Sequence, residues 1–143
     1  MRLHGREPGT IVAYSKFYFN KPDGGISAMY GTSSQLAATG STNGSYNLFL
    51  GTFNWLKLIN ANDQVRAVSL VLTTANGSLW EKSYMLQPHA VLELPLHEGA
   101  IFGTSAERYG PLRVQGNGIA ATLLRFRQSS AGGLDFAFPT EVN

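Results

Sequence analysis

The sequence predicts an all-β protein, an antiparallel β-sandwich of about ten short strands. Two observations lead to this fold class. Aromatic, β-branched and other apolar residues come in short runs separated by Gly, Asn, Asp, Ser and Pro, and almost no stretch keeps a helical period over three turns. The chain has 143 residues and no cysteine, so it forms no disulfide. A chain of this length is long enough to bury a core without one.

The beginning of the chain resembles its end. Residues 11–30 match residues 119–138 without a gap, at an offset of 108 residues, and each segment has two strand-like runs around a Gly-Gly turn. A repeat of this length is a domain period, longer than a solenoid repeat of roughly 20–50 residues. We therefore expect residues 1–35 to form a hairpin that ends a preceding repeat or serves as an assembly arm, and residues 36–143 to form the sandwich. The alternative is a single domain with two related hairpins. The matching pairs are Ile11 and Ile119, Ala13 and Ala121, Tyr18 and Phe126, Gly24 and Gly132, Gly25 and Gly133, Ile26 and Leu134, and Tyr30 and Phe138.

The first hairpin is expected to consist of the strands Thr10–Asn20 and Ile26–Tyr30. Lys21–Gly25 forms its turn, because proline presets a turn backbone angle and glycine takes positive φ at little steric cost. The following segment, Gly31–Ser45, is nearly all small and polar, which is typical of a linker or a long connection. Within it, only Gln35–Ala38 has the composition of a helical turn.

The remaining strands follow at short intervals. Asn76-Gly77 separates two strand-like runs, and both residues tolerate the positive φ of a type I′ turn, so the dipeptide predicts a hairpin. In the run before it, Val68, Leu70 and Leu72 recur at every second position, as expected of a strand with one face more fully buried. The expected strands are Phe53–Asn60, Val65–Ala75, Ser78–Leu86, Val91–Pro95, Ala100–Phe102, Tyr109–Gln115, Ile119–Gln128 and Leu134–Phe138.

The composition argues against several partners. The formal net charge is only +2, and Arg125 and Arg127 share a strand face without any dense cluster of basic residues around them, so we expect no nucleic-acid binding. No apolar run approaches the roughly 20 residues of a membrane-spanning helix, and the first residues contain no signal-peptide core, so we expect no membrane insertion.

No constellation of residues predicts catalysis, a metal site or a cofactor. His4, His89 and His97 lack a metal-binding spacing, although His89 and His97 would approach each other if Val91–Pro95 folded back. Asp63 has only amide neighbours, which compensate a calcium charge poorly, so a turn is favoured there. The carboxylates are scattered and no nucleophile elbow occurs, so no enzyme is expected.

The aromatic residues are more numerous than one buried strand face requires. Trp80, Tyr84 and Tyr109 are candidates for a platform that stacks on a sugar ring or anchors a protein partner. In the competing interpretation, Trp80 and Trp55 are core residues that lie between two sheets.

The central part of the chain resembles the immunoglobulin-like modules that are repeated in bacterial extracellular and cell-surface proteins. The resemblance rests on the apolar run Trp55–Asn60, the polar turn Ala61–Gln64, the alternating strand Val65–Thr73 with its Gly turn, and the proline corner Leu86–His89. It covers about Trp55 to Phe138, and the cysteine pair of antibody-type domains is absent. The resemblance implies an immunoglobulin-like or jelly-roll-like sandwich with a scaffold or adhesive role outside the cell or on its surface.

Three functions follow as hypotheses. The first is a non-catalytic structural module that self-associates through β-strand contacts, as a homo-oligomer or tandem repeats, because an unpaired apolar strand edge is an association site. The second is an adhesin module that binds carbohydrate or protein through exposed aromatics. The third is a viral or phage structural β-sandwich protein. The assembly hairpin of the first hypothesis contains Ile11, Ala13, Tyr18, Gly24, Gly25, Ile26 and Tyr30.

Overall fold

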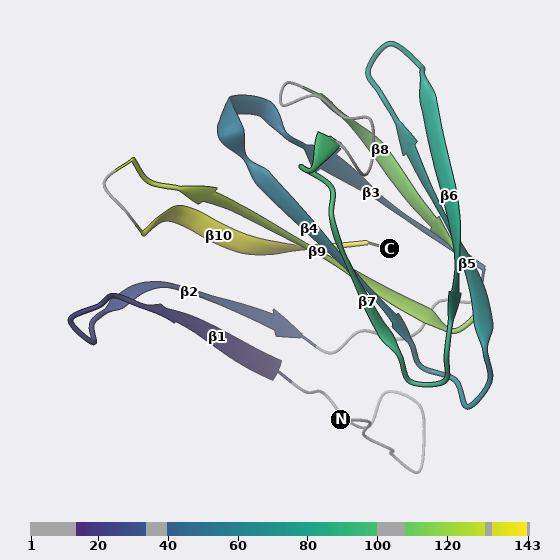
Figure 1. Ribbon diagram of the computed structural model, residues 1–143, viewed down its shortest axis with the longest axis horizontal. Coiled ribbons are helices and arrows are strands. Elements are labelled where there is room, and N and C mark those ends of the chain that lie inside the picture. Colours follow the sequence, from purple (N-terminus) through teal and green to yellow (C-terminus); the bar gives the residue numbers. More distant parts are fainter. Residues whose placement is uncertain (1–13, 34–39, 100–107, 131–132, 143) are drawn as a thin grey trace.

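The computed structural model describes residues 14–33, 40–99, 108–130 and 133–142. They form ten strands and one short 3-10 turn (Figure 1). The elements are β1 (Tyr14–Asn20), β2 (Ile26–Ser33), β3 (Ser41–Asn47), η1 (Phe49–Gly51), β4 (Phe53–Asn60), β5 (Arg66–Thr73), β6 (Leu79–Leu86), β7 (Val91–Pro95), β8 (Tyr109–Gln115), β9 (Ile119–Gln128) and β10 (Leu134–Glu141).

Two antiparallel four-stranded sheets form a sandwich. One has the strand order β10-β9-β4-β7 and the other has the order β3-β8-β5-β6. The prediction of an all-β antiparallel sandwich is therefore confirmed. The first hairpin, β1–β2, is a separate two-stranded sheet that projects beside the sandwich, with β2 alongside β10 and β1 on its outer side (Figure 1).

The core lies between the two four-stranded sheets, where branched aliphatic side chains of both sheets meet. β4 alternates strictly between partly buried and buried residues, and Val68, Leu70 and Leu72 of β5 are all buried, as the alternation predicts. Each such side chain contributes roughly 1.5–3 kcal/mol when fully buried. The core residues are Tyr46, Leu48, Leu56, Leu58, Val68, Leu70, Leu72, Leu86, Leu94, Leu96, Leu112, Val114, Ile119, Ala121, Leu123 and Val142.

Two buried asparagines, Asn54 and Asn60, connect the two ends of β4 to neighbouring elements through hydrogen bonds. Asn54 accepts a hydrogen bond from the Asn47 N–H (3.0 Å) and donates one to the Asn47 carbonyl (2.5 Å), which ties β4 to the end of β3. Asn60 donates to the carbonyls of Gln64 (2.8 Å) and Leu86 (3.1 Å), among others, and so ties β4 to the corner before β5 and to the end of β6. Because buried amides are stable only with partners, these bonds fix how the chain crosses between the sheets.

The interpretation of Gly31–Ser45 as a linker is wrong at both ends. β2 continues to Ser33, and β3 starts at Ser41 as the edge strand beside β8. β3 turns only Thr42 and Tyr46 into buried positions, so its sequence carries little apolar signal. Gln35–Ala38 and Ala100–Phe102 lie outside the described residues, as do the first positions of the strand expected from Thr10.

The turn at Asn76-Gly77 forms a hairpin, but not through a type I′ turn. Only Gly77 has a positive φ (84°), and its N–H donates to the Thr74 carbonyl (2.9 Å), while the Thr74 N–H donates to Ser78 (2.9 Å). This is a three-residue loop with glycine in the left-handed position. The Asn76 side chain supports it by accepting from the Ser78 N–H (3.3 Å).

Candidate functional site

The β1–β2 and β9–β10 hairpins have the same register. Every ladder pair of the first hairpin, from Tyr14 with Ser33 to Asn20 with Ile26, has a counterpart 108 residues later, from Thr122 with Glu141 to Gln128 with Leu134. The sequence offset therefore corresponds to a matching backbone arrangement, strand for strand.

The irregularities of the two hairpins match as well. Each ladder passes over one residue near the turn, Ser27 in the first hairpin and Asp135 in the second. Each turn closes in the same way, because Lys21 N–H donates to the Gly25 carbonyl (2.6 Å) and Ser129 N–H donates to the Gly133 carbonyl (3.2 Å). A bulge and a turn that coincide in both copies are specific features of one hairpin design.

The two hairpins differ in the side chains of their first strands, β1 and β9. Where β9 has Arg125 and Arg127, β1 has Phe17 and Phe19. Arg125 donates to the carbonyl and, at 2.9 Å, to the Oγ of Ser45 in β3. Arg127 lies 3.4 Å from the carboxylate of Asp135. In β1 the aromatic rings stack within the hairpin, with Phe17 and Phe19 both against Tyr30.

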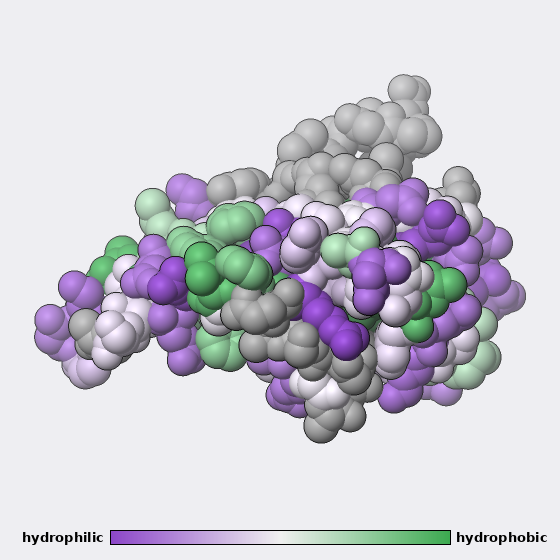
Figure 2. All heavy atoms as spheres, turned by 90° about the horizontal axis from the view of Figure 1, so that it is seen from above, coloured by the Kyte–Doolittle hydropathy of each residue, from purple (hydrophilic) through white to green (hydrophobic). Residues whose placement is uncertain are grey.

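Large apolar side chains are exposed on both faces of β1–β2. Phe17 (42%) and Phe19 (37%) lie on one face, Tyr18 (52%) and Met29 (62%) on the other, and Ile26 (56%) next to the turn. Apolar side chains gather where the narrow end of the molecule joins its wider part, while the tip of that end is mostly hydrophilic (Figure 2). An exposed apolar cluster of this kind is typical of an interaction surface.

The surroundings of Tyr30 indicate which face of the β1–β2 hairpin is directed toward the sandwich. Burial raises the pKa of the Tyr30 hydroxyl, while the charge of Lys57 lowers it and that of Glu93 raises it. Lys57 and Glu93 form an ion pair (2.8 Å) across β4 and β7, on the side of the sheet opposite the core. Tyr30 and the rings stacked on it therefore face this outer side, whereas Tyr18 and Met29 face away from it.

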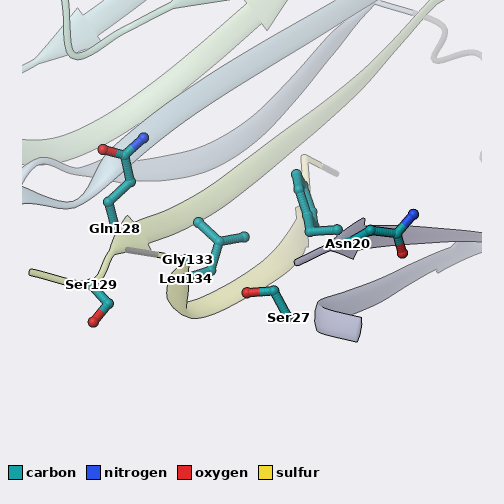
Figure 3. A pocket seen from close by; sticks show the side chains of 7 residues that line it. Asn20, Ser27, Gln128, Ser129, Gly133 and Leu134 are labelled. Atoms are coloured by element: carbon teal, nitrogen blue, oxygen red, sulfur yellow. The ribbon is translucent and has the colours of Figure 1, made fainter. Parts of the chain in front are cut away.

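The tips of the two hairpins meet at an open pocket (Figure 3). Its lining comes from the ends of β1 and β9 and the starts of β2 and β10. The Ser27 hydroxyl points toward Gly133, where an added Cβ would lie 2.8 Å from the Ser27 Oγ. The pocket is thus a seam between the two hairpins, lined by Phe19, Asn20, Ser27, Gln128, Ser129, Gly133 and Leu134.

The structure places most residues of the expected assembly hairpin in β1–β2. Tyr18, Ile26 and Tyr30 lie on its strands, and Gly24 (φ 85°) and Gly25 form its turn. Ile11 and Ala13 lie outside the described residues.

The three aromatics expected to form a binding platform do not share one face. Trp80 and Tyr84 of β6 lie opposite Leu72 and Val68 of β5 and pack against the core. Tyr109 is exposed at the start of β8, on the face opposite the core-facing residues of that strand.

A different aromatic cluster was missed by the sequence reasoning. Phe53 and Trp55 of β4 point to the outer side of their sheet, and Phe53 stacks on Phe126 of β9 with ring centroids 5.0 Å apart. His97 packs edge-on against Phe53 (4.6 Å) and lies 5.9 Å from Trp55. Phe53 and Trp55 alternate with the buried Asn54 and Leu56. This alternation indicates that Trp55 lies on the outer side of the sheet, so the interpretation of Trp55 as a core residue is wrong.

His89 and His97 lie apart from each other, and His4 lies outside the described residues. His89 pairs with Asp63 (2.9 Å) beside the Asn60 end of β4. His97 lies at the Asn54 end, with its Nδ1 3.3 Å from the Asn54 carbonyl, so about 20 Å of strand separates the two sites. Within the described part of the chain, no group of three or more His, Cys, Asp or Glu residues is placed to hold a metal ion. None of its helices is long and apolar enough to span a membrane.

Comparison with known proteins gives a fold but no family. No protein-family model matches the chain, and no curated protein matches it. A solved structure, the crystal structure of Thermotoga maritima 1070, is similar with a TM-score of 0.57 at 15% sequence identity, over 77% of this chain and 96% of that chain. This identity shows a shared β-sandwich fold alone. The resemblance to immunoglobulin-like modules and the extracellular location that it implies stay predictions.

Proposed function

We propose that this protein is a non-catalytic structural subunit that associates with further copies of itself through the β1–β2 hairpin. The observation that carries the proposal is the exposure of large apolar side chains on both faces of this hairpin. A two-stranded hairpin is marginally stable in water by itself, and its open apolar edge favours pairing with another chain. Association would cover the side chains that the sandwich leaves exposed.

The comparison of the two hairpins supports the proposal. The β9–β10 hairpin belongs to a four-stranded sheet, because β9 pairs with β4. The arginines of β9 make polar contacts with Ser45 and Asp135. The corresponding positions of β1 are phenylalanines, which favour burial rather than solvent. The hairpin outside the sandwich therefore has apolar side chains at positions where the hairpin within the sheet has arginines.

The test is the solution mass, measured by size-exclusion chromatography with light scattering over a wide concentration range. We expect a concentration-dependent oligomer, and we expect the double variant Tyr18→Ser/Met29→Ser to stay monomeric at concentrations where the unmodified chain associates. A matched control exists in Tyr109→Ser/Met85→Ser, because these side chains are of the same types and similarly exposed (53% and 66%). The control is expected to associate normally.

Two results would contradict the proposal. One is a strict monomer at every concentration. The other is an equal loss of association in the hairpin variant and in the Tyr109/Met85 control, because this would place the contact elsewhere or make it non-specific.

A second candidate function is recognition of a carbohydrate by the outer-face cluster of Phe53, Trp55, Phe126 and His97. Its support is the gathering of aromatic rings outside the core, since sugar rings stack on such surfaces. In a Trp80→Phe background, Trp55 is the single tryptophan. We expect its fluorescence to respond to a panel of soluble glycans. An unchanged spectrum, with unaltered glycan retention of Trp55→Ala, would exclude this candidate.

A further inference from the structure

We propose that β1 of one copy pairs antiparallel with β1 of a second copy, about a two-fold axis at Phe17, so that the two hairpins form one continuous four-stranded sheet. The inference rests on the proposed function and deepens it by naming the contacting edge, the partner strand and the register. A two-fold contact of this kind is closed and uses the same surface on both copies.

The open edge of β1 is the first observation behind this inference. Its counterpart β9 is paired on both sides, with β10 on one side and with Phe53–Asn60 of β4 on the other. Among the described residues β1 pairs with β2 alone, and its open edge corresponds to the edge of β9 that binds β4. The backbone N–H and C=O groups of that edge are therefore arranged for an antiparallel partner.

The other sheet edges carry features that discourage pairing. β7 has only five residues and ends at Pro95, and β10 contains Pro139 and lies beside β2. β6 has the charged pair Glu81-Lys82 in its middle, and β3 is built of small and polar residues around a glycine. β1 has fewer of these devices, since its sequence YSKFYFN contains no proline, glycine or acidic residue and Lys16 is its single charged side chain. It is the least protected edge of the described sheets.

The second copy is the occupant because β1 is complementary to itself in one register. Pairing all seven residues places Phe17 opposite Phe17 of the partner subunit. Residues directly opposite each other share a face, so Lys16 lies opposite the partner's Tyr18, and Ser15 lies opposite the partner's Phe19. Each lysine then meets an aromatic ring rather than a like charge, which is a favourable contact.

Both registers shifted by two residues pair fewer residues, and one of them also opposes like charges. A shift of two residues in one direction places Lys16 opposite Lys16 of the partner subunit, and like charges directly opposite destabilise a ladder. A shift of two residues in the other direction places Tyr18 opposite the partner's Tyr18. Either shift leaves two residues of each strand unpaired.

Charge substitutions at Tyr18 test the register. Tyr18→Glu and Tyr18→Lys remove the same ring, but in the proposed register the first places two carboxylates opposite Lys16 residues and the second places two ammonium groups there. We expect the dimer dissociation constant of Tyr18→Lys to exceed that of Tyr18→Glu by about tenfold at low salt. The difference is expected to shrink at high salt, because the charges are exposed. Equal dissociation constants would overturn the register.

Disulfide trapping is an independent test, because the chain has no cysteine of its own. Under mild oxidation, Phe17→Cys is expected to form a covalent dimer, since opposite residues of a ladder lie within disulfide reach. A mixture of Ser15→Cys and Phe19→Cys is expected to form a mixed dimer, whereas neither forms one alone. Met29→Cys, exposed on β2, is the control and is expected to stay unlinked.

The outcomes separate the two proposals. Association of the unmodified chain without any of these links, or with linking at Met29→Cys instead, would overturn the β1–β1 pairing and leave the proposed function standing. A chain that never associates would overturn both. The Ser15→Cys and Phe19→Cys mixture keeps the test valid if loss of the Phe17 ring weakens the contact.

Discussion

Phe17 and Tyr30 stack across the ladder of the β1–β2 hairpin, with ring centroids 4.9 Å apart and planes inclined by 14°. The equivalent pair in β9–β10 is Arg125 and Phe138. In the sandwich, Arg125 reaches out to Ser45 of β3, whereas in the projecting hairpin the phenylalanine turns to its own cross-strand neighbour. The first hairpin is thus stabilised from within, and the second by the rest of the sandwich.

Phe17→Ala is expected to loosen the hairpin and leave the sandwich intact. The stack contributes about 0.5–1.5 kcal/mol beyond burial, and the hairpin has no core of its own to compensate. We expect amide hydrogen exchange of β2 to rise several-fold in dilute solution, while β4 and β9 keep their protection. Met29→Ala, on the opposite face, is the control and is expected to change exchange little. Unchanged exchange of β2 in Phe17→Ala would show that the stack is not what holds the hairpin.

Asn60→Ala is expected to lower the free energy of unfolding by about 3 kcal/mol. Its side chain donates to the buried carbonyl of Leu86 and accepts from the Asn62 N–H (3.0 Å), and removing it takes these hydrogen bonds away. Each unsatisfied buried group costs about 1–3 kcal/mol. Urea unfolding measures the change, with the exposed Asn117→Ala as the control, because Asn117 contacts Asn62 through its backbone carbonyl, which the substitution keeps. Equal stability of both variants would contradict the role of Asn60.

The strands of the sandwich could be predicted from the sequence because their residues alternate. Val68, Leu70 and Leu72 are buried on one face of β5, and this period of two is visible without knowledge of any partner. β3 could not be found in this way, because an edge strand built of small polar residues needs only Thr42 and Tyr46 to turn inward. Its position is set by pairing with β8, more than sixty residues away.

The candidate site was predictable in part. The offset between the two hairpins is a local similarity, and it can be recognised in the sequence. The stack of Phe53 on Phe126 could not be predicted, since it depends on the pairing of β4 with β9. The same holds for Trp80, which the sequence left open as a platform residue or a core residue and whose cross-strand partner Leu72 places it against the core. Side-chain patterns show which face a residue occupies only after the pairing is known.

Two glycines with similar backbone angles are expected to tolerate a methyl group differently. Gly118 has φ 73°, and an added Cβ would lie 2.0 Å from the Asn62 Nδ2, whereas Gly24 has φ 85° and no atom within 4 Å of an added Cβ. Gly24→Ala is expected to cost about 1 kcal/mol from backbone strain alone. Gly118→Ala carries the same strain and also displaces Asn62 from the Gly118 carbonyl (3.0 Å), so its loss is expected to be at least twice as large. Thermal unfolding of the two variants measures the difference, and equal losses would contradict the role of Asn62.

Glu93 is expected to make a small, pH-dependent contribution to stability. The hydrogen bond from Lys57 holds the pKa of the Glu93 carboxyl below its ordinary value of 4.5, against a weaker opposing effect of burial. Because the folded pKa is the lower one, the stabilisation is present above pH 4.5 and is lost as the pH falls through the folded pKa. Both side chains are nearly half exposed (42% and 46%), and solvent screening keeps the contribution below about 1 kcal/mol.

The variant Glu93→Gln tests this contribution through urea unfolding at pH 7 and at pH 3. We expect it to be slightly less stable than the unmodified chain at pH 7 and to differ less from it at pH 3, so that its loss of stability on acidification is smaller. Glu98→Gln removes the same charge just beyond β7 and controls for the change in net charge. A Glu93→Gln variant that loses as much stability on acidification as the unmodified chain would show that the Lys57 pair does not favour the ionised carboxylate in the folded state.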